Sequence, residues 1–238
     1  MTGKPSTAKS LPARFEDIRE RVRKAAVRAN RDPAEITIIG IGKTHPTSAL
    51  QEALHAGISD LGENRVQEAE AKINELGRRA TRWHLVGHLQ ANKARKAVRL
   101  FDVVHSIDSR ELVQGLERLC IEENVAEFST LIQVDLGGEE TKTGINRREL
   151  PELVQAFQGL QRVRLIGLMT LPPFFEDPKD ARPFFQQLRE LRDELQTAGN
   201  FAETRGELSM GMTHDFEVAI EEGATMVRIG TAIFGERN

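Results

Sequence analysis

Short apolar runs alternate with amphipathic stretches along most of the chain. Phe15, Ile18 and Val22 follow one another at three- and four-residue spacing, which predicts a helix ahead of the first strand. Segment 36–42 (ITIIGIG) is uncharged and rich in β-branched residues, and it therefore predicts a buried strand. Similar runs predict seven further strands, at 58–62, 82–87, 102–107, 129–136, 163–171, 207–211 and 225–230.

Helical periodicity returns between these strands, most clearly over 66–76 and 181–195. Ser48 and Gln51 have the spacing of a capping box and predict the start of the helix after the first strand. Eight strand–helix units of roughly 30 residues account for the 238 residues, which favours a single (β/α)8 TIM-type barrel. An open doubly wound sheet shows the same alternation, usually with fewer strands, and is the alternative.

The composition is that of a globular protein with a core. Hydrophobic residues make up 39% and charged residues 29% of the chain, and the net charge of −3 argues against nucleic acid or an anionic membrane as the main partner. Residues 1–11 contain no apolar signal core, so we expect a flexible tail there and the barrel at 12–238. No segment is apolar enough to span a membrane and the single cysteine excludes an intrachain disulfide, so we expect a cytoplasmic protein.

Polar residues follow several predicted strands at the ends that build the active site in such barrels. Lys43 comes directly after the first strand, behind seven uncharged residues, and Asn64 follows the second. Partial removal from water favours the neutral amine, the form that attacks a carbonyl carbon, although a lysine extending into solvent is the other interpretation. The segment resembles dinucleotide-binding and P-loop motifs, but His45 and Thr37 stand where those motifs need glycine.

The loops after the last two strands predict a phosphate site, because barrels often bind phosphate there at the start of a short helix. Segments 209–213 and 228–235 supply the hydroxyls of Ser209 and Thr231 and glycines that admit a ligand, although ordinary helix caps would look similar. Arg228 lies in an otherwise uncharged strand. Its guanidinium therefore needs a partner, such as the ring nitrogen of a ligand or a carboxylate across the barrel.

Three other patterns have simple structural interpretations. His84 and His88 share a strand face, but no third ligand lies at a spacing typical of zinc sites, so we expect no metal. We interpret Cys120 as a small buried hydrophobic residue. The basic stretch 92–99 is expected to be a solvated helix face.

With a lysine after its first strand and phosphate loops after its last two, the chain resembles the pyridoxal phosphate homeostasis protein family, whose fold is similar to the N-terminal domain of alanine racemase. The resemblance runs from residue 39 to the C-terminus, and its last segment, 208–237, is thirty residues long. The other matching segments are IGIGKTHP (39–46), LGENRVQEAEAKI (61–73), WHLVGHLQANKARKAV (83–98), GEETKTGI (138–145) and IGLMTLPP (166–173).

The resemblance implies pyridoxal 5'-phosphate (PLP) as the cofactor and Lys43 as the residue that carries it as a Schiff base. Arg228 would face the pyridine nitrogen, and Lys142 would lie near the cofactor entrance and relay PLP. Three residues would hold the phosphate: Ser209, Gly230 and Thr231. Three more would line the pocket: Asn64, His84 and Met210.

The chain departs from the family pattern at three places near this pocket. Gly42 stands where serine is usual, Thr44-His45 where threonine–lysine is common, and Thr213-His214 where a serine-containing pair is usual. These changes leave the Schiff-base lysine and the phosphate loops in place, but they bear on the shape of the pocket and on PLP exchange.

Two functions are compatible with this resemblance. In the first, the protein binds PLP reversibly and buffers it or delivers it to PLP-requiring apo-enzymes without turning over a substrate. In the second, it is an amino-acid racemase or a related PLP enzyme. We favour the first. An arginine at the pyridine nitrogen weakens the ring as an electron sink, but alanine racemase also carries such an arginine, so the missing second base weighs more. The family comparison also implies that alanine racemase takes its second base, a tyrosine, from a further domain of the partner subunit. This chain has no tyrosine, and without that domain we expect a monomer.

Overall fold

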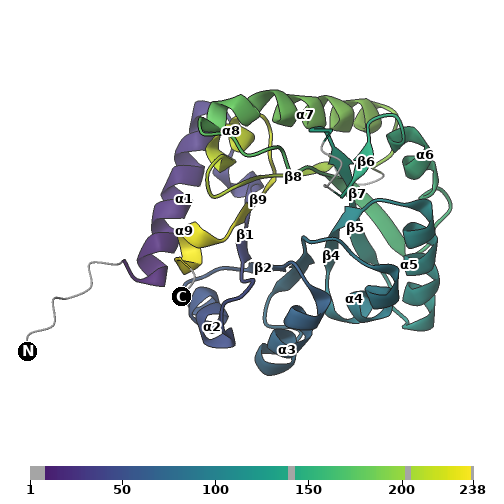
Figure 1. Ribbon diagram of the computed structural model, residues 1–238, viewed down its shortest axis with the longest axis horizontal. Coiled ribbons are helices and arrows are strands. Elements are labelled where there is room, and N and C mark those ends of the chain that lie inside the picture. Colours follow the sequence, from purple (N-terminus) through teal and green to yellow (C-terminus); the bar gives the residue numbers. More distant parts are fainter. Residues whose placement is uncertain (1–8, 139–142, 202–204, 237–238) are drawn as a thin grey trace, which may run out of the picture.

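Parallel strands form the centre of the molecule and helices surround them (Figure 1). The computed structural model describes residues 9–138, 143–201 and 205–236. The eight barrel strands in this part of the chain are β1 (Thr37–Ile41), β2 (Asp60–Glu63), β3 (Arg82–Leu85), β4 (Val103–Ile107), β5 (Phe128–Asp135), β7 (Val163–Met169), β8 (Glu207–Met212) and β9 (Met226–Ile229). Each of the eight predicted segments overlaps one of these strands, and β2, β5 and β8 each extend one residue outside the predicted segment.

The sheet closes on itself. The strand order runs β4-β3-β2-β1-β9-β8-β7-β5, and β4 also pairs with β5, so every one of these strands has a parallel neighbour on both sides. The predicted (β/α)8 barrel is therefore confirmed, and the open doubly wound sheet, which would keep two free edges, is excluded. A two-residue strand, β6 (Ile145–Asn146), pairs in parallel with the last two residues of β5.

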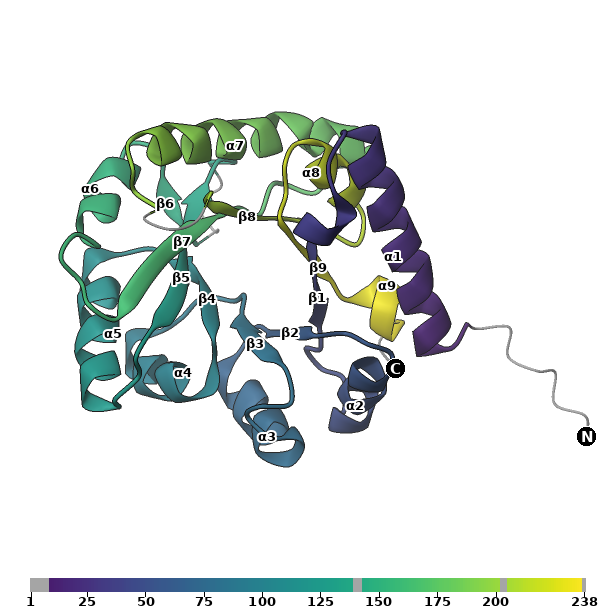
Figure 2. The ribbon, with the colours of Figure 1, turned by 180° about the vertical axis from the view of Figure 1, so that it is seen from behind.

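A helix follows each barrel strand and covers the outside of the barrel (Figures 1 and 2). These helices are α2 (Thr47–His55), α3 (Val66–Leu76), α4 (Ala94–Leu100), α5 (Arg110–Glu122), α6 (Leu150–Gln155), α7 (Arg182–Thr197), α8 (Phe216–Glu221) and α9 (Thr231–Phe234). Short 3-10 turns lie at Pro33–Glu35, Ala91–Lys93 and Pro178–Ala181.

The first helix, α1 (Leu11–Arg28), confirms the predicted helix ahead of β1 and packs against α2, α8 and α9 (Figure 2). Because α9 has only 4 residues and α8 only 6, these two helices cover little of the barrel wall. The apolar face of α1, with Phe15, Ile18 and Val22 buried, completes the ring of helices at this point.

Alternate strand residues face the two sides of the barrel wall. The large core cluster combines outward strand residues such as Trp83 and Val104 with the inner faces of the helices. Two small clusters contain strand residues of the opposite parity, among them Ile39, Met226 and Leu131, and these fill part of the barrel interior. The rest of the barrel interior is unusually polar.

Two local predictions were wrong. Ser48 and Gln51 do not form a capping box, because the N-cap residue of α2 is Pro46, two residues before Ser48, and the helix makes no side-chain cap. In α7, Phe184 is one of the periodic apolar residues that predicted the helix over 181–195, but it is only half-buried, and its neighbour Phe185 packs into the core instead. The first error concerns where the helix begins, and the second concerns the angle at which the helix docks.

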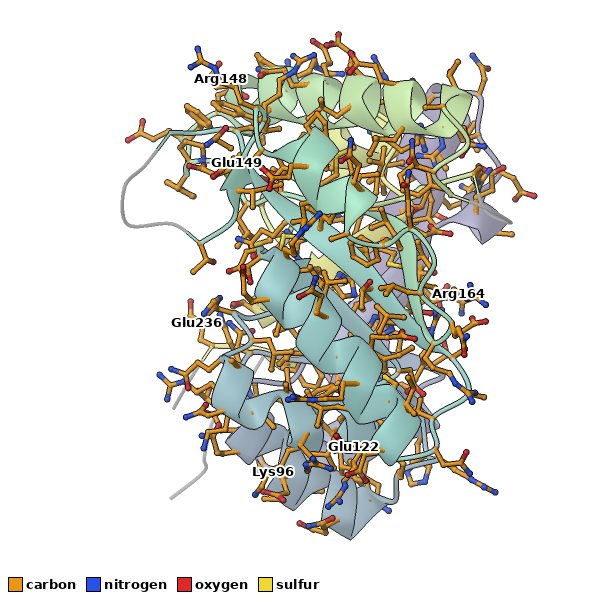
Figure 3. All side chains as sticks on the ribbon, turned by 90° about the vertical axis from the view of Figure 1, so that its right-hand side faces the viewer. Lys96, Glu122, Arg148, Glu149, Arg164 and Glu236 are labelled. Carbon is orange, nitrogen blue, oxygen red and sulfur yellow. The ribbon has the colours of Figure 1, made fainter. Side chains whose placement is uncertain are left out.

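The basic stretch 92–99 lies along α4, on a surface rich in charged side chains (Figure 3). Lys96 lies 2.6 Å from Glu70, and Arg95 and Arg99 pair with acidic residues of α5 and its C-terminal end, Glu122 and Glu123. As predicted, this is a solvated helix face, and its positive charges are matched by neighbours. In the described part of the chain, no helix has the length and apolar character needed to cross a membrane.

Candidate functional site

The C-terminal ends of the barrel strands surround a cavity of about 750 Å³. Its rim includes residues of the loops after β7 and β8, among them Phe174, Thr213 and His214. Five of the predicted site residues line this cavity: Lys43, Asn64, Arg228, Gly230 and Thr231. They follow or belong to β1, β2 and β9, which are neighbours in the barrel, and this adjacency brings residues far apart in sequence to one place.

Lys43 lies in a tight turn at the end of β1 and is half-buried. The His45 N–H donates to the Gly42 carbonyl oxygen at 3.1 Å, and Thr44 has a φ of 66°, which is unusual for a β-branched residue. Backbone strain of this kind often occurs at ligand sites. The turn places the Lys43 side chain at the cavity rather than along the strand.

A buried ion pair supports this turn from outside the barrel wall. The Lys72 ammonium group on α3 donates to the Gly42 carbonyl oxygen and to Glu63 Oε1, both at 2.7 Å. Glu63 is fully buried and its Oε2 has no hydrogen-bond partner among the described residues. Burial raises the pKa of Glu63, and the Lys72 ammonium opposes this rise. The sequence pattern predicted α3, but it did not reveal that a lysine on its inner face reaches the strand end.

Gly42 has little room for a side chain. A Cβ atom at this position would lie 2.9 Å from Leu50 Cδ1 and 3.1 Å from Glu63 Oε1. The glycine therefore lets α2 and the Glu63 carboxylate approach the turn closely, which is a packing role for a residue that departs from the family pattern.

Arg228 is a buried cation without a carboxylate partner within the described residues. Its side chain is only 4% exposed, and its guanidinium donates to the Ser209 hydroxyl at 2.6 Å and to the Thr170 carbonyl oxygen at 2.9 Å. Burial lowers the pKa of Arg228 to about 10, and Asp215 acts in the opposite direction from a distance. A buried charge held only by neutral groups is costly, so this residue fits a ligand that brings its own acceptor.

At the end of the cavity where the sequence predicts a phosphate site, the hydroxyl groups that line the cavity differ from those expected. Thr231 and Thr213 both line the cavity, whereas the Ser209 hydroxyl is buried against Arg228 and His105. The first N–H groups of α9 follow Gly230, and N–H groups at a helix start have no acceptor within the helix. Thr213 belongs to the segment predicted to bind phosphate, but composition could not tell which of its hydroxyls would face the ligand.

Gly211, in the same segment, serves packing. It has a φ of 88°, and a Cβ atom there would lie 2.6 Å from Ala219 Cβ and 2.9 Å from Phe216 Cα on α8. The glycine thus allows α8 to sit directly on β8, and this contact sets the position of the loop that carries Thr213.

Three of the predicted residues that the structure describes do not line the cavity. His84 and Ser209 are buried inside the barrel, and the Met210 side chain packs in the large core cluster outside it. Lys142 lies outside the described residues. His88, considered with His84 as a metal ligand, is exposed beyond the end of β3 and lies 3.1 Å from Asp108. Within the described residues, no group of three or more histidine, cysteine or acidic side chains is arranged to hold a metal ion.

Comparison with known proteins agrees with this fold. The model of the family "Alanine racemase, N-terminal domain" matches residues 14–238, which defines the class of barrel. The pyridoxal phosphate homeostasis protein of Aquifex aeolicus (strain VF5) is 44% identical over 224 residues, covering 94% of this chain and 97% of that protein. The protein of the same name from Escherichia coli (strain K12) is 40% identical over 233 residues, covering 93% and 94%. The chain therefore belongs to the pyridoxal phosphate homeostasis protein family.

A solved structure gives the same result. PipY of Synechococcus elongatus PCC7942, determined with PLP bound, superposes with a TM-score of 0.79 at 38% sequence identity, and the match covers 95% of this chain and all of that one. The barrel described above is thus shared over nearly its whole length with a protein that holds this cofactor.

Proposed function

We propose that the protein binds PLP as a Schiff base on Lys43 and acts in PLP homeostasis in the cytoplasm, buffering or delivering the cofactor without substrate turnover. One observation carries this proposal. A lysine at the end of β1 and a buried arginine without a carboxylate partner among the described residues line the same cavity. The membership of the family and the PLP complex of PipY support it.

The residues at the cavity fit three of the polar groups of PLP: the aldehyde, the phosphate and the pyridine nitrogen. The Lys43 amine attacks the aldehyde carbon, and the condensation releases one water molecule. Thr213, Thr231 and the first N–H groups of α9 hold the phosphate, as helix starts commonly do. Arg228 donates a hydrogen bond to the pyridine nitrogen, and this nitrogen supplies a further acceptor for the buried guanidinium. Bound PLP supplies an electrophilic carbon and an electron-withdrawing ring.

The same residues support binding without turnover. Arg228 is a hydrogen-bond donor that remains charged at neutral pH, so it keeps the pyridine nitrogen unprotonated and weakens the ring as an electron sink, which by itself does not exclude turnover. The sequence contains no tyrosine, so the chain itself cannot supply the phenol that serves as second base in the alanine-racemase route. Delivery to apo-enzymes, a relay role for Lys142 and a monomeric state belong to this proposal.

Borohydride reduction tests the covalent link. Purified protein incubated with PLP should become yellow, and reduction followed by peptide mass spectrometry should place the adduct on Lys43. Lys43→Ala should give no adduct at this position, whereas Lys93→Ala, which changes a lysine lining a neighbouring cavity, should react like the wild type. A wild-type protein that forms no adduct contradicts the proposal.

A screen with enantiomerically pure amino acids tests the absence of turnover. PLP-loaded protein should leave the optical activity of L- and D-amino acids unchanged over hours. Loss of optical activity that requires PLP and disappears in Lys43→Ala would instead establish a racemase.

A further inference from the structure

A chain of hydrogen bonds crosses the barrel interior behind the cavity. Arg228 donates to the Ser209 hydroxyl at 2.6 Å, and Ser209 Oγ lies 2.8 Å from His105 Nδ1. His105 Nε2 lies 2.9 Å from His84 Nδ1, and His84 Nε2 lies 2.9 Å from Asp60 Oδ1. The five residues come from β9, β8, β4, β3 and β2, and all are buried. Branched apolar side chains usually fill this part of a barrel, so a polar layer needs an explanation.

The chemistry of these five residues allows only one donor-to-acceptor direction along the hydrogen bonds that join them. The Asp60 carboxylate has a lowered pKa, to which its hydrogen bonds from His84 and Ser59 contribute against burial, and it can only accept, so His84 Nε2 carries a proton. Burial lowers the pKa of His84 and of His105, and both rings are therefore neutral. A neutral His84 accepts at Nδ1 from His105 Nε2–H, and a neutral His105 accepts at Nδ1 from the Ser209 hydroxyl.

Every donor in the chain thus points from Arg228 towards Asp60. The Ser209 oxygen accepts from Arg228 while its only proton goes to His105, so this hydroxyl has no proton left to donate to a ligand. With its second bond to the Thr170 carbonyl oxygen, the guanidinium is held on two sides. The cation at one end and the carboxylate at the other end are joined through neutral groups that each have one permitted orientation.

We propose that Asp60, His84 and His105 are positioning residues that act through Ser209 to hold Arg228 as an oriented hydrogen-bond donor at the floor of the cavity. This inference rests on the proposed function for the identity of the acceptor, the pyridine nitrogen of PLP. Ser209 then acts on the ring end of the cofactor rather than on its phosphate.

A role in stability alone would not require these residues. Buried polar networks are at best neutral for stability compared with well-packed apolar side chains, and they become costly when one member is lost. Such a network is useful where it fixes the position and the charge of the group at its end, as Arg228 requires at a ligand site.

The tautomers of the two histidines test this series of hydrogen bonds without any cofactor. In 15N-labelled wild-type protein, His84 and His105 should both carry their proton on Nε2 and should remain neutral between pH 8 and pH 6. Signals are assigned among the 6 histidines of the chain with single His→Gln variants. A proton on Nδ1 of either ring, or protonation within this range, would overturn the inference.

Binding of PLP and of pyridoxal, which lacks the phosphate, tests the link to Arg228. His105→Phe removes the acceptor of Ser209 and the donor to His84, and it should weaken both ligands by a similar factor, on the order of tenfold. His105→Gln, whose amide can accept from Ser209 and donate to His84, should restore most of the affinity. The double variant His105→Phe/Arg228→Gln should bind no worse than Arg228→Gln alone, because both changes act on one contact.

A control distinguishes this effect from loss of stability. Thr130→Val removes a different buried hydrogen bond, from Thr130 to the Arg164 carbonyl oxygen, and should lower stability without changing affinity. Additive effects in the double variant, or a loss for PLP that pyridoxal does not share, would overturn the inference. A wild-type protein that binds neither compound would overturn the proposed function as well, whereas Nδ1–H tautomers in a protein that binds PLP would overturn the inference alone.

Discussion

The ammonium group of Lys72 lies 2.7 Å from the carbonyl oxygen of Gly42, the residue that precedes Lys43. The same ammonium group pairs with the buried carboxylate of Glu63 at the end of β2. One side chain of α3 therefore ties together two neighbouring strand ends and the turn that presents Lys43. Because the pair is buried, each charge depends on the other.

Lys72→Met should lower the free energy of unfolding by about 3–5 kcal/mol, because it leaves the Glu63 carboxylate buried without its partner. Adding Glu63→Leu removes that unpaired charge, and the double variant should recover part of the loss. Urea unfolding can be followed through Trp83, the single tryptophan, which is fully buried. Equal losses in the single and double variants would contradict a stabilising role for the ion pair.

Gly87→Ala should destabilise the protein and disturb the cavity. A Cβ atom at Gly87 would lie 2.2 Å from the backbone carbonyl oxygen of Asn64, which lines the cavity, and a backbone atom cannot move aside cheaply. We expect a loss of roughly 1–3 kcal/mol or more in urea unfolding and weaker PLP binding. The matched control is Gly115→Ala in α5, where a Cβ atom meets nothing within 4 Å and helix propensity should add about 0.5–1 kcal/mol. A loss of similar size in both variants would show that the close approach to Asn64 is not the cause.

Stability should fall as the pH decreases below about 6.5. Burial lowers the pKa of His84 and His105 below the ordinary value of 6.5, which they regain on unfolding. Between these values the unfolded chain binds more protons, so each histidine costs up to about 1.4 kcal/mol per pH unit as the pH falls. The charges acting on the pair are Asp60 and Asp102, which favour protonation, and Arg82 and Arg228, which oppose it.

Urea unfolding at pH 8, 6.5 and 5.5 measures this dependence. The wild-type protein should be equally stable at the two higher values and weaker at the lowest. His105→Gln, which removes one of the two groups, should show a shallower decline. An unchanged slope in this variant would mean that the titration belongs to other groups.

Thr213→Val should weaken PLP binding by about tenfold, because it removes a hydroxyl that faces the phosphate end of the cavity. The affinity for pyridoxal should be unchanged, since that ligand has no phosphate. Fluorescence titration with both compounds gives the comparison. A variant that loses affinity for both ligands would place Thr213 at another part of the cofactor.

Cys120 should be inert in the folded protein. It is fully buried in the helical layer, and burial raises the pKa of its thiol to about 12, so almost no thiolate is present at pH 8. A coloured thiol reagent should react with one equivalent only after denaturation in urea. Rapid labelling of the native protein would indicate that α5 opens readily.

The order of strands and helices could be predicted because each element carries its own pattern. Short apolar runs marked all eight barrel strands, and the residues directly after β1 and β2, Lys43 and Asn64, were placed at the cavity by the geometry that every parallel barrel shares. The residues at which elements end, and the face that a helix buries, were harder to predict from the sequence. The false capping box at Ser48 concerns where a helix begins, and the exchange of Phe184 for Phe185 depends on how a helix docks, which local sequence does not encode.

The sequence by itself determined the barrel, the strand-end lysine and the charge-poor strand that contains Arg228. Only the tertiary structure decided which polar groups meet. Ser209 and Thr213 are equally plausible hydroxyls in the sequence, but β8 turns the first into the barrel towards Arg228 and His105 and leaves the second at the cavity. Lys72 and Asp60 belong to the second strand–helix unit and His105 to the fourth, and their partners Glu63, His84 and Ser209 lie between 9 and 104 residues away along the chain. Such contacts arise from the closure of the barrel, which brings distant strands together at its axis, and no local pattern records them.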